Sequence, residues 1–144
     1  MVEVRPPDAR DEWEASWYRE RLHDPSLIDF GVVVVVDGIG FLAVPVGGRR
    51  RGGYLAVDDF AMVGQLRAAL AGLEGFPSVR VRRSTDPRVC HAVEWGDPAP
   101  RSDSEVIRGW FYGFSEQAVV RFCQERDVWP ARRGRSATVR RHSW

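Results

Sequence analysis

Residues 31–46 read GVVVVVDGIGFLAVPV and carry the clearest structural signal in the chain. The five valines of Val32–Val36 are β-branched and apolar on both faces, which is typical of a central strand covered on both sides. Asp37-Gly38 is a favoured two-residue hairpin turn, and a second apolar run follows it. Pro45 favours an edge or a bulge where that second strand ends. We therefore predict an antiparallel hairpin whose first strand is central.

The segment before the hairpin predicts a helix. Asp8 is a candidate cap for this helix, and Pro25 marks its end. Trp13, Trp17 and Tyr18 are spaced so that one face of the helix is aromatic. We expect these side chains to pack on the core or to form a contact surface.

The segment after the hairpin predicts a strand and then a helix. The strand is YLAV (residues 54–57), and Asp58 and Asp59 can cap the helix over residues 60–75. Apolar residues at helical spacing give this helix one apolar stripe: Phe60, Val63, Leu66, Leu70 and Leu73.

The second half of the chain has a similar order. Residues 76–84 (FPSVRVRRS) and 89–96 (VCHAVEWG) are interpreted as two paired strands, with one helical turn after them. Residues 110–114 (WFYGF) are interpreted as a compact aromatic strand. Ser115 then caps a helix over residues 116–129.

Hairpin, loop, strand, cap and helix thus occur in residues 31–74 and again in residues 78–129. This order indicates a duplicated β-β-β-α unit after the N-terminal helix, although generic strand-to-helix patterning explains it equally well. We predict an α+β domain over residues 1–130, with two layers and an antiparallel-rich sheet that carries helices on one face. Residues 131–144 are expected to form a basic, flexible tail.

The composition restricts the class of protein. A chain of 144 residues with 44% hydrophobic residues fits one globular domain. The longest apolar run is far shorter than the ~20 residues of a membrane helix, and the N-terminus lacks the pattern of a signal peptide. We expect a cytoplasmic protein without a membrane partner or a cofactor. Cys90 and Cys123 are too few for a disulfide framework and are expected to be free thiols.

Charge is distributed unevenly along the chain. All 21 residues of the Lys+Arg total are arginines, a bias that GC-rich coding also produces. Residues 1–130 hold 16 arginines against 20 acidic residues, whereas residues 131–144 hold five arginines and no acidic residue. An acidic body with a basic tail is typical of proteins that contact phosphate backbones, and a solvated chain end is the alternative.

The stretch GGRRRGGY (residues 47–54) places three arginines between two glycine pairs. Backbone amides in glycine-rich loops and guanidinium groups both bind phosphates. A Walker loop additionally needs a lysine and a hydroxyl, which this stretch lacks. We interpret it as a strand connector that is either merely solvated or also contacts an anion. The candidate anion-binding residues are those of this loop and of the tail: Arg49, Arg50, Arg51, Arg132, Arg133, Arg135, Arg140 and Arg141.

The stretch CHAVEWG (residues 90–96) contains the weak catalytic candidates Cys90, His91 and Glu94. Adjacent residues of a strand face opposite sides, so Cys90 and His91 do not form a nucleophile–base pair with each other. Glu94 shares the face of Cys90, but a carboxylate raises the pKa of a thiol and lowers its reactivity. Neither CxxC nor HxxxH spacing is present, and we predict no metal. These arguments weigh against an enzyme without deciding the question.

Glu94 also has a structural interpretation. If its strand pairs with the preceding one, Arg80 or Arg82 lies across from it as an ion pair. If the same face lines a pocket, these three residues, His91 and Tyr112 are the polar groups available to an acidic ligand.

Three motifs carry a resemblance to a known family: AVPVGGRRRGGYLAV (residues 43–57), CHAVEWG (90–96) and WFYGFSEQAV (110–119). In these motifs the chain resembles a family of small actinobacterial proteins of unknown function. The likeness covers residues 13–125, so the basic tail lies outside it. The resemblance implies a host group and assigns no activity or site.

The leading functional prediction is a non-enzymatic binding or accessory protein that contacts an anionic partner, such as nucleic acid, through its arginines. The first alternative is a small enzyme or ligand-binding protein of specialised metabolism that uses the pocket around Glu94. The second alternative is a subunit that works as a homo-oligomer or hetero-oligomer through exposed aromatic residues of the first helix.

Overall fold

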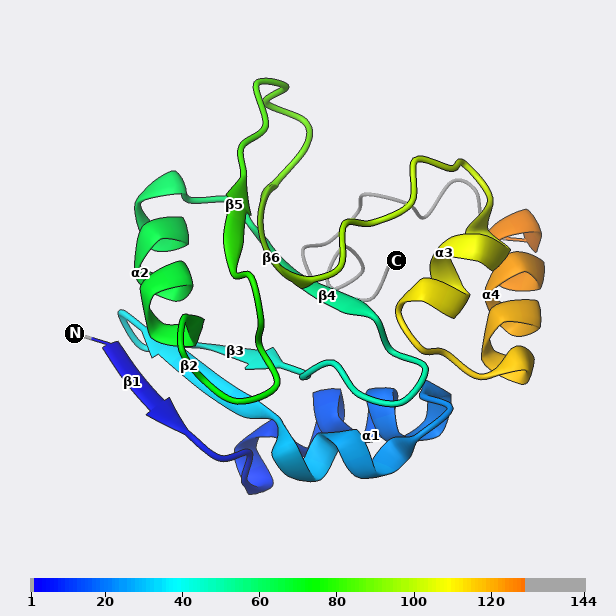
Figure 1. The fold of residues 1–144 in the computed structure, drawn as a ribbon, viewed down its shortest axis with the longest axis horizontal. Helices are drawn as coiled ribbons and strands as arrows, with labels where there is room; N and C mark the ends of the chain where they lie inside the picture. Colours follow the sequence, from blue (N-terminus) through cyan, green and yellow to red (C-terminus); the bar gives the residue numbers. More distant parts are fainter. Residues whose placement is uncertain (1, 129–144) are drawn as a thin grey trace.

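The computed structural model describes residues 2–128 and shows an α+β fold (Figure 1). The strands of this part are β1 (Val2–Arg5), β2 (Val32–Val36), β3 (Ile39–Ala43), β4 (Gly52–Val57), β5 (Arg80–Arg82) and β6 (His91–Gly96). The α-helices are α1 (Glu12–Arg21), α2 (Phe60–Leu70), α3 (Glu105–Phe111) and α4 (Glu116–Val128), and the 3-10 helices η1 (Ala9–Asp11) and η2 (Pro25–Phe30) flank α1. The predicted α+β class is confirmed. None of the helices within residues 2–128 has the length and apolar character needed to cross a bilayer.

The predicted valine hairpin is present. Val36 pairs with Ile39 across a turn in which Asp37 and Gly38 have φ angles of 50° and 80°, as a type I′ turn requires. β2 lies between β1 and β3 in an antiparallel sheet, so the central position of the valine strand is confirmed. β1 was not expected from the sequence and covers the outer edge of β2.

β4, β6 and β5 form a second antiparallel sheet in that order, which confirms the predicted pairing of β5 with β6. The register places Tyr54, Glu94 and Arg80 opposite one another in a single row across the three strands. Because side chains alternate along a strand, this row lies on one face of the sheet. Val93 and Trp95 point to the other face and are fully buried.

Helix α2 packs against both sheets and completes this core (Figure 1). Val63, Leu66 and Leu70 of its predicted apolar stripe are buried, whereas Phe60 in the first turn is 47% exposed. Full burial of an aliphatic side chain of this size contributes about 1.5–3 kcal/mol. The stripe of α2 therefore holds the two sheets together.

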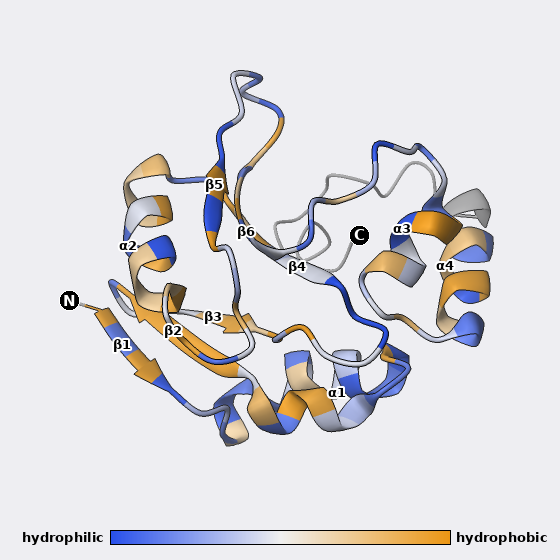
Figure 2. Ribbon diagram, in the orientation of Figure 1, coloured by the Kyte–Doolittle hydropathy of each residue, from blue (hydrophilic) through white to orange (hydrophobic). Residues whose placement is uncertain are grey.

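A second apolar cluster covers the opposite face of the first sheet. Val33 and Leu42 pack there with Tyr18 from α1 and Val119 from α4. Figure 2 shows β2 as continuously apolar and the loop that leads into β4 as hydrophilic. Helices therefore cover both faces of the first sheet, whereas the sequence predicted helices on one face only. The reason is that alternate valines of β2 point to opposite faces and both sets need burial.

The predicted aromatic strand at residues 110–114 is wrong, because this segment ends helix α3. Ser104 caps the helix by accepting a hydrogen bond from the Ile107 amide (3.4 Å). The Phe111 carbonyl accepts a hydrogen bond from the Arg51 amide (2.9 Å), so the end of α3 packs on the loop before β4. The second half of the described chain thus has two strands and two helices, and the duplicated β-β-β-α unit is not present.

Candidate anion-binding face

The glycine–arginine loop before β4 is a tight turn. Gly47 and Arg50 exchange two backbone hydrogen bonds of 3.0 and 2.9 Å, which leaves Gly48 and Arg49 at the tip. Gly48 has a φ of 53°, a left-handed conformation that glycine adopts at low cost. The turn sends consecutive arginines in different directions: Arg49 and Arg51 are exposed, whereas Arg50 is buried.

Arg50 points into the core, and only 5% of its surface is exposed. Its Nη1 donates a hydrogen bond to the Tyr112 carbonyl (2.8 Å), and its Nη2 donates one to the Val44 carbonyl (3.3 Å). Burial lowers the pKa of Arg50, and nearby tyrosines oppose this effect. The prediction that Arg50 is a surface anion contact is therefore wrong, since carbonyl oxygens of the core accept its hydrogen bonds.

Three arginines and two carboxylates form a continuous line on the surface, which we call the arginine row. Arg51 Nη2 lies 2.9 Å from Asp97 Oδ2, and Arg82 Nε lies 3.3 Å from Glu94 Oε2. Arg80 lies between these pairs: its Nη2 donates to the Asp97 carbonyl (3.2 Å), and its Nε is 3.9 Å from Glu94 Oε1. The predicted pairing of Glu94 with Arg80 or Arg82 is confirmed.

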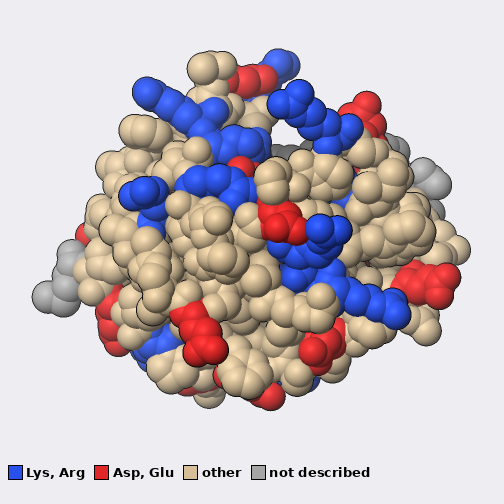
Figure 3. Space-filling model, viewed as in Figure 1, with Lys and Arg blue, Asp and Glu red and all other residues tan. Residues whose placement is uncertain are grey.

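The arginine row has more positive than negative groups. It holds three guanidinium groups against two carboxylates. Figure 3 shows that basic side chains gather over the upper and central part of this view, where β5, β6 and the loop into β4 lie in Figure 1. Many of the acidic side chains in the view lie along its lower edge. A surface with this distribution attracts anions.

Two tyrosines and a further arginine lie beside the arginine row. Tyr54 is directly opposite Glu94, and its ring centroid is 5.3 Å from that of Tyr112. Burial raises the pKa of both phenols, so both keep their protons at neutral pH. Arg108 precedes Tyr112 by one turn of α3 and shares its helix face, where its charge opposes the rise in the Tyr112 pKa.

The predicted pocket residues therefore separate into two places. Arg80, Arg82, Glu94 and Tyr112 lie together around the second sheet and the end of α3. His91 points to the opposite face of β6, as the alternation of the strand predicts.

His91 and Cys90 have partners of their own. The Nδ1 atom of His91 accepts a hydrogen bond from the Ser84 amide (3.0 Å), and its ring centroid lies 5.1 Å from that of Phe60. The Cys90 thiol donates a hydrogen bond to Asp58 Oδ1 (2.7 Å). The structure therefore does not bring these two catalytic candidates together with Glu94. Within residues 2–128, no group of three His, Cys, Asp or Glu side chains is placed to hold a metal ion.

The sequence interpretation missed Arg108 and Tyr54 as members of this site. The signal for Arg108 was its spacing of four residues from Tyr112, which brings two side chains together only on a helix. Interpreting residues 110–114 as a strand concealed that spacing. Tyr54 reaches Glu94 only because β4 pairs with β6, two strands that are not consecutive in the chain.

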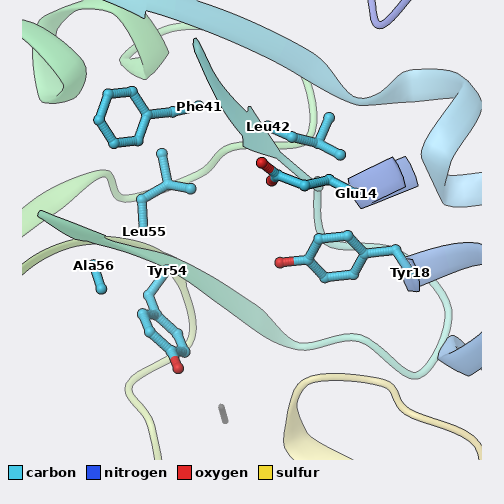
Figure 4. A pocket seen from close by; sticks show the side chains of 7 residues that line it. All are labelled: Glu14, Tyr18, Phe41, Leu42, Tyr54, Leu55 and Ala56. Atoms are coloured by element: carbon cyan, nitrogen blue, oxygen red, sulfur yellow. The ribbon is translucent and has the colours of Figure 1, made fainter. Parts of the chain in front are cut away.

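A small pocket lies elsewhere, between α1 and the neighbouring strands β3 and β4 (Figure 4). It is lined by Glu14, Tyr18, Phe41, Leu42, Tyr54, Leu55 and Ala56. Figure 4 shows the Glu14 carboxylate and the Tyr18 hydroxyl directed toward the same space, whereas the Tyr54 hydroxyl points away from it. Tyr54 therefore separates this pocket from the arginine row, and the pocket is not the one that the sequence predicted.

The tail arginines lie outside the described residues: Arg132, Arg133, Arg135, Arg140 and Arg141. No curated protein and no solved structure matches the chain. The sequence model of a family of unknown function, DUF6302, matches residues 5–142. This match includes most of the tail, so the expectation that the tail lies outside the family resemblance is wrong. Since the match covers nearly the whole sequence, the chain belongs to the DUF6302 family of unknown function.

Proposed function

We propose that this protein binds nucleic acid as an anionic partner through the arginine row. The observation that carries the proposal is the placement of Arg51 beside β4 and of Arg80 and Arg82 on β5, so that they flank β6. Guanidinium groups in such a line bind successive phosphates, each with two parallel hydrogen bonds. The excess of guanidinium over carboxylate groups leaves the row attractive to a polyanion.

The ion pairs within the arginine row do not prevent binding. The side chains of Arg51 and Asp97 are 69% and 55% exposed, and pairs of this kind contribute only about 0–1 kcal/mol. A phosphate therefore competes effectively with Asp97 for Arg51, whereas Arg82, whose Nε is paired with Glu94, offers its Nη atoms. Arg49, at the tip of the adjoining turn, is exposed and forms no hydrogen bond or ion pair within residues 2–128.

The distribution of charge along the chain also supports binding of a polyanion through the arginine row. Residues 1–46 contain four arginines and nine acidic residues, whereas residues 47–111 contain ten arginines and eight acidic residues. The segment that forms the arginine row is thus the basic part of an otherwise acidic body. Such an asymmetry turns the basic face toward an approaching polyanion.

Fluorescence anisotropy with a labelled single-stranded oligonucleotide tests the proposal. We expect binding at about 50 mM salt that weakens steadily toward about 200 mM, because binding releases counterions. The double variant Arg51→Gln/Arg82→Gln should bind more weakly. Its salt slope should be less steep by roughly 1.4, about 0.7 for each lost phosphate contact with a single strand.

The matched control is Arg10→Gln/Arg19→Gln, which also removes two exposed arginines held in surface ion pairs, with Asp8 and Glu12. This variant should bind like the parent protein. An absence of binding at low salt, or an equal loss in both double variants, would refute the proposal.

We place this function in the cytoplasm. The two cysteines in the described chain, Cys90 and Cys123, are free thiols, which a reducing compartment maintains.

A second candidate function is the binding of a small acidic ligand, which the grouping of Arg82, Glu94 and Tyr112 favours.

A further inference from the structure

Five residues form a chain of neighbours from α3 to β5. Arg108 lies on α3, and Tyr112, the C-cap of this helix, follows one helical turn later on the same face. The Tyr112 ring contacts that of Tyr54, with 5.3 Å between centroids, and Tyr54 is opposite Glu94 in the sheet register. Glu94 in turn accepts a hydrogen bond from Arg82 (3.3 Å). Two guanidinium groups, one from the helix and one from the sheet, therefore flank a pair of tyrosines.

Positive charge is left uncompensated at this place. Arg108 is half-buried, and its guanidinium group forms no hydrogen bond or ion pair with any described residue. Glu94, whose side chain is 15% exposed, is already shared between Arg80 and Arg82. Arg80, Arg82 and Arg108 together with Glu94 thus carry a net charge of +2 around the two tyrosines.

We infer that the space between Arg82 and Arg108 binds a phosphate monoester group. At pH 7 such a group carries about −1.5 to −2 charges, which matches the net charge of +2 of these four side chains. A phosphodiester carries a single negative charge and leaves a net charge of +1 at this place. The inference rests on the proposed function and specifies which phosphate of the partner this face prefers.

Tyr112 supplies a neutral donor for the same group, and the ring of Tyr54 packs beside it. Because burial raises the pKa of both phenols, their hydroxyls stay protonated and do not repel an anion. Tyr112 is 5% exposed, and its hydroxyl has no hydrogen-bond partner among residues 2–128. It is therefore available to a phosphate oxygen. Glu94 acts as a positioning residue, because its ion pair fixes the direction of Arg82.

The test compares phosphate monoesters from two sources with matched ligands that lack them. Isothermal titration calorimetry with inorganic phosphate, AMP and adenosine examines free ligands. Anisotropy with one oligonucleotide carrying either a 5′-phosphate or a 5′-hydroxyl examines strand ends. For a site that takes free nucleotides, we expect AMP to bind and adenosine not to bind. For a site that takes strand ends, we expect the 5′-phosphate to strengthen oligonucleotide binding at least about tenfold. Both expectations follow because charged hydrogen bonds of this kind are strong. A gain confined to AMP identifies a free nucleotide as the source, and a gain confined to the oligonucleotide identifies a strand end.

The inference and the proposed function fail in different ways. Equal binding of both oligonucleotides, without binding of phosphate or AMP, would overturn the inference and leave the proposed function intact. Binding of AMP without binding of either oligonucleotide would overturn the proposed function and leave the phosphate site intact.

Substitutions locate the site. Arg108→Gln should reduce the advantage of the phosphorylated ligand to about onefold, while Arg101→Gln, a change of an exposed arginine just before α3, should leave it unchanged. Arg82→Gln is the second variant and should also abolish the advantage, which keeps the test decisive if Arg108→Gln fails to fold. A full advantage in both folded site variants would overturn the inference.

Discussion

Arg50 donates a 2.8 Å hydrogen bond to the carbonyl oxygen of Tyr112, a residue 62 positions further along the chain. Next to this contact, the Arg51 amide donates a 2.9 Å hydrogen bond to the Phe111 carbonyl. The two bonds join the loop before β4 to the end of α3. They therefore fix the relative positions of Arg51 and Arg108, which belong to the two sides of the candidate site.

Replacing Arg50 should destabilise the fold. In Arg50→Ala the Tyr112 carbonyl loses its donor and a cavity opens beneath the loop, so we expect a loss of about 2–4 kcal/mol in the free energy of unfolding. Urea denaturation followed by tryptophan fluorescence measures the change. The control is Arg49→Ala, an exposed neighbour, which should stay within about 0.5 kcal/mol of the parent. Similar stabilities for the two variants would contradict the structural role of Arg50.

Gly113 is needed for the close approach of α3 to Arg50. It has a φ of 78°, and a Cβ atom placed on it would lie 2.5 Å from the Arg50 Cβ. Gly38 has a similar φ of 80° and no atom within 4 Å of such a Cβ.

Thermal and urea unfolding of Gly113→Ala and Gly38→Ala therefore separate two effects. Gly38→Ala should cost about 1–2 kcal/mol from backbone strain alone. Gly113→Ala should cost about 1–3 kcal/mol more, because the neighbouring backbone must also move. Equal losses in the free energy of unfolding would show that the loop around Arg50 moves away from the added Cβ atom without an energetic cost.

The sequence predicted the features of the fold that depend on neighbouring residues. The turn at Asp37 and Gly38 follows from two residues that tolerate positive φ, and the buried face of α2 follows from its helical spacing. Strand β1 gave no comparable signal, because its four residues form a strand only by pairing with the free edge of β2 in the folded chain. The run Trp110–Phe114 was interpreted wrongly because a short aromatic stretch suits a strand or a helix end equally well.

The candidate site was predicted only in part for the same reason. Glu94, Arg80 and Arg82 lie on adjacent strands, so their pairing follows from the hairpin pattern. The inward direction of Arg50 depends on glycines and carbonyl groups from distant segments, and no local pattern encodes it. Arg108 joins the site through the packing of α3, which is likewise a property of the folded chain.

The Asp59 cap makes a measurable contribution to α2. Its side chain accepts a hydrogen bond from the Ala61 amide (2.9 Å) at the start of the helix. Asp59→Ala should lower the free energy of unfolding by about 1 kcal/mol, whereas Asp59→Asn, which keeps a capping oxygen, should change it little. Denaturant unfolding of the two variants provides the comparison. An equal loss in both would assign the effect to the charge of Asp59 and not to its hydrogen bond.

Stability should fall at alkaline pH because of the buried phenols. Burial raises the pKa of Tyr54 and Tyr112 above the ordinary value of 10.0, so above about pH 10 the folded state binds more protons than the unfolded state. The linkage relation then gives a free energy of unfolding that decreases as pH rises. The chain has no lysine, which leaves few other groups to titrate in this range. Urea unfolding between about pH 8 and 11 should show the decrease, and Tyr112→Phe should make it shallower, since that variant lacks one of the two groups. A free energy of unfolding that stays constant across this interval would show that both phenols ionise in the folded protein as readily as in the unfolded chain.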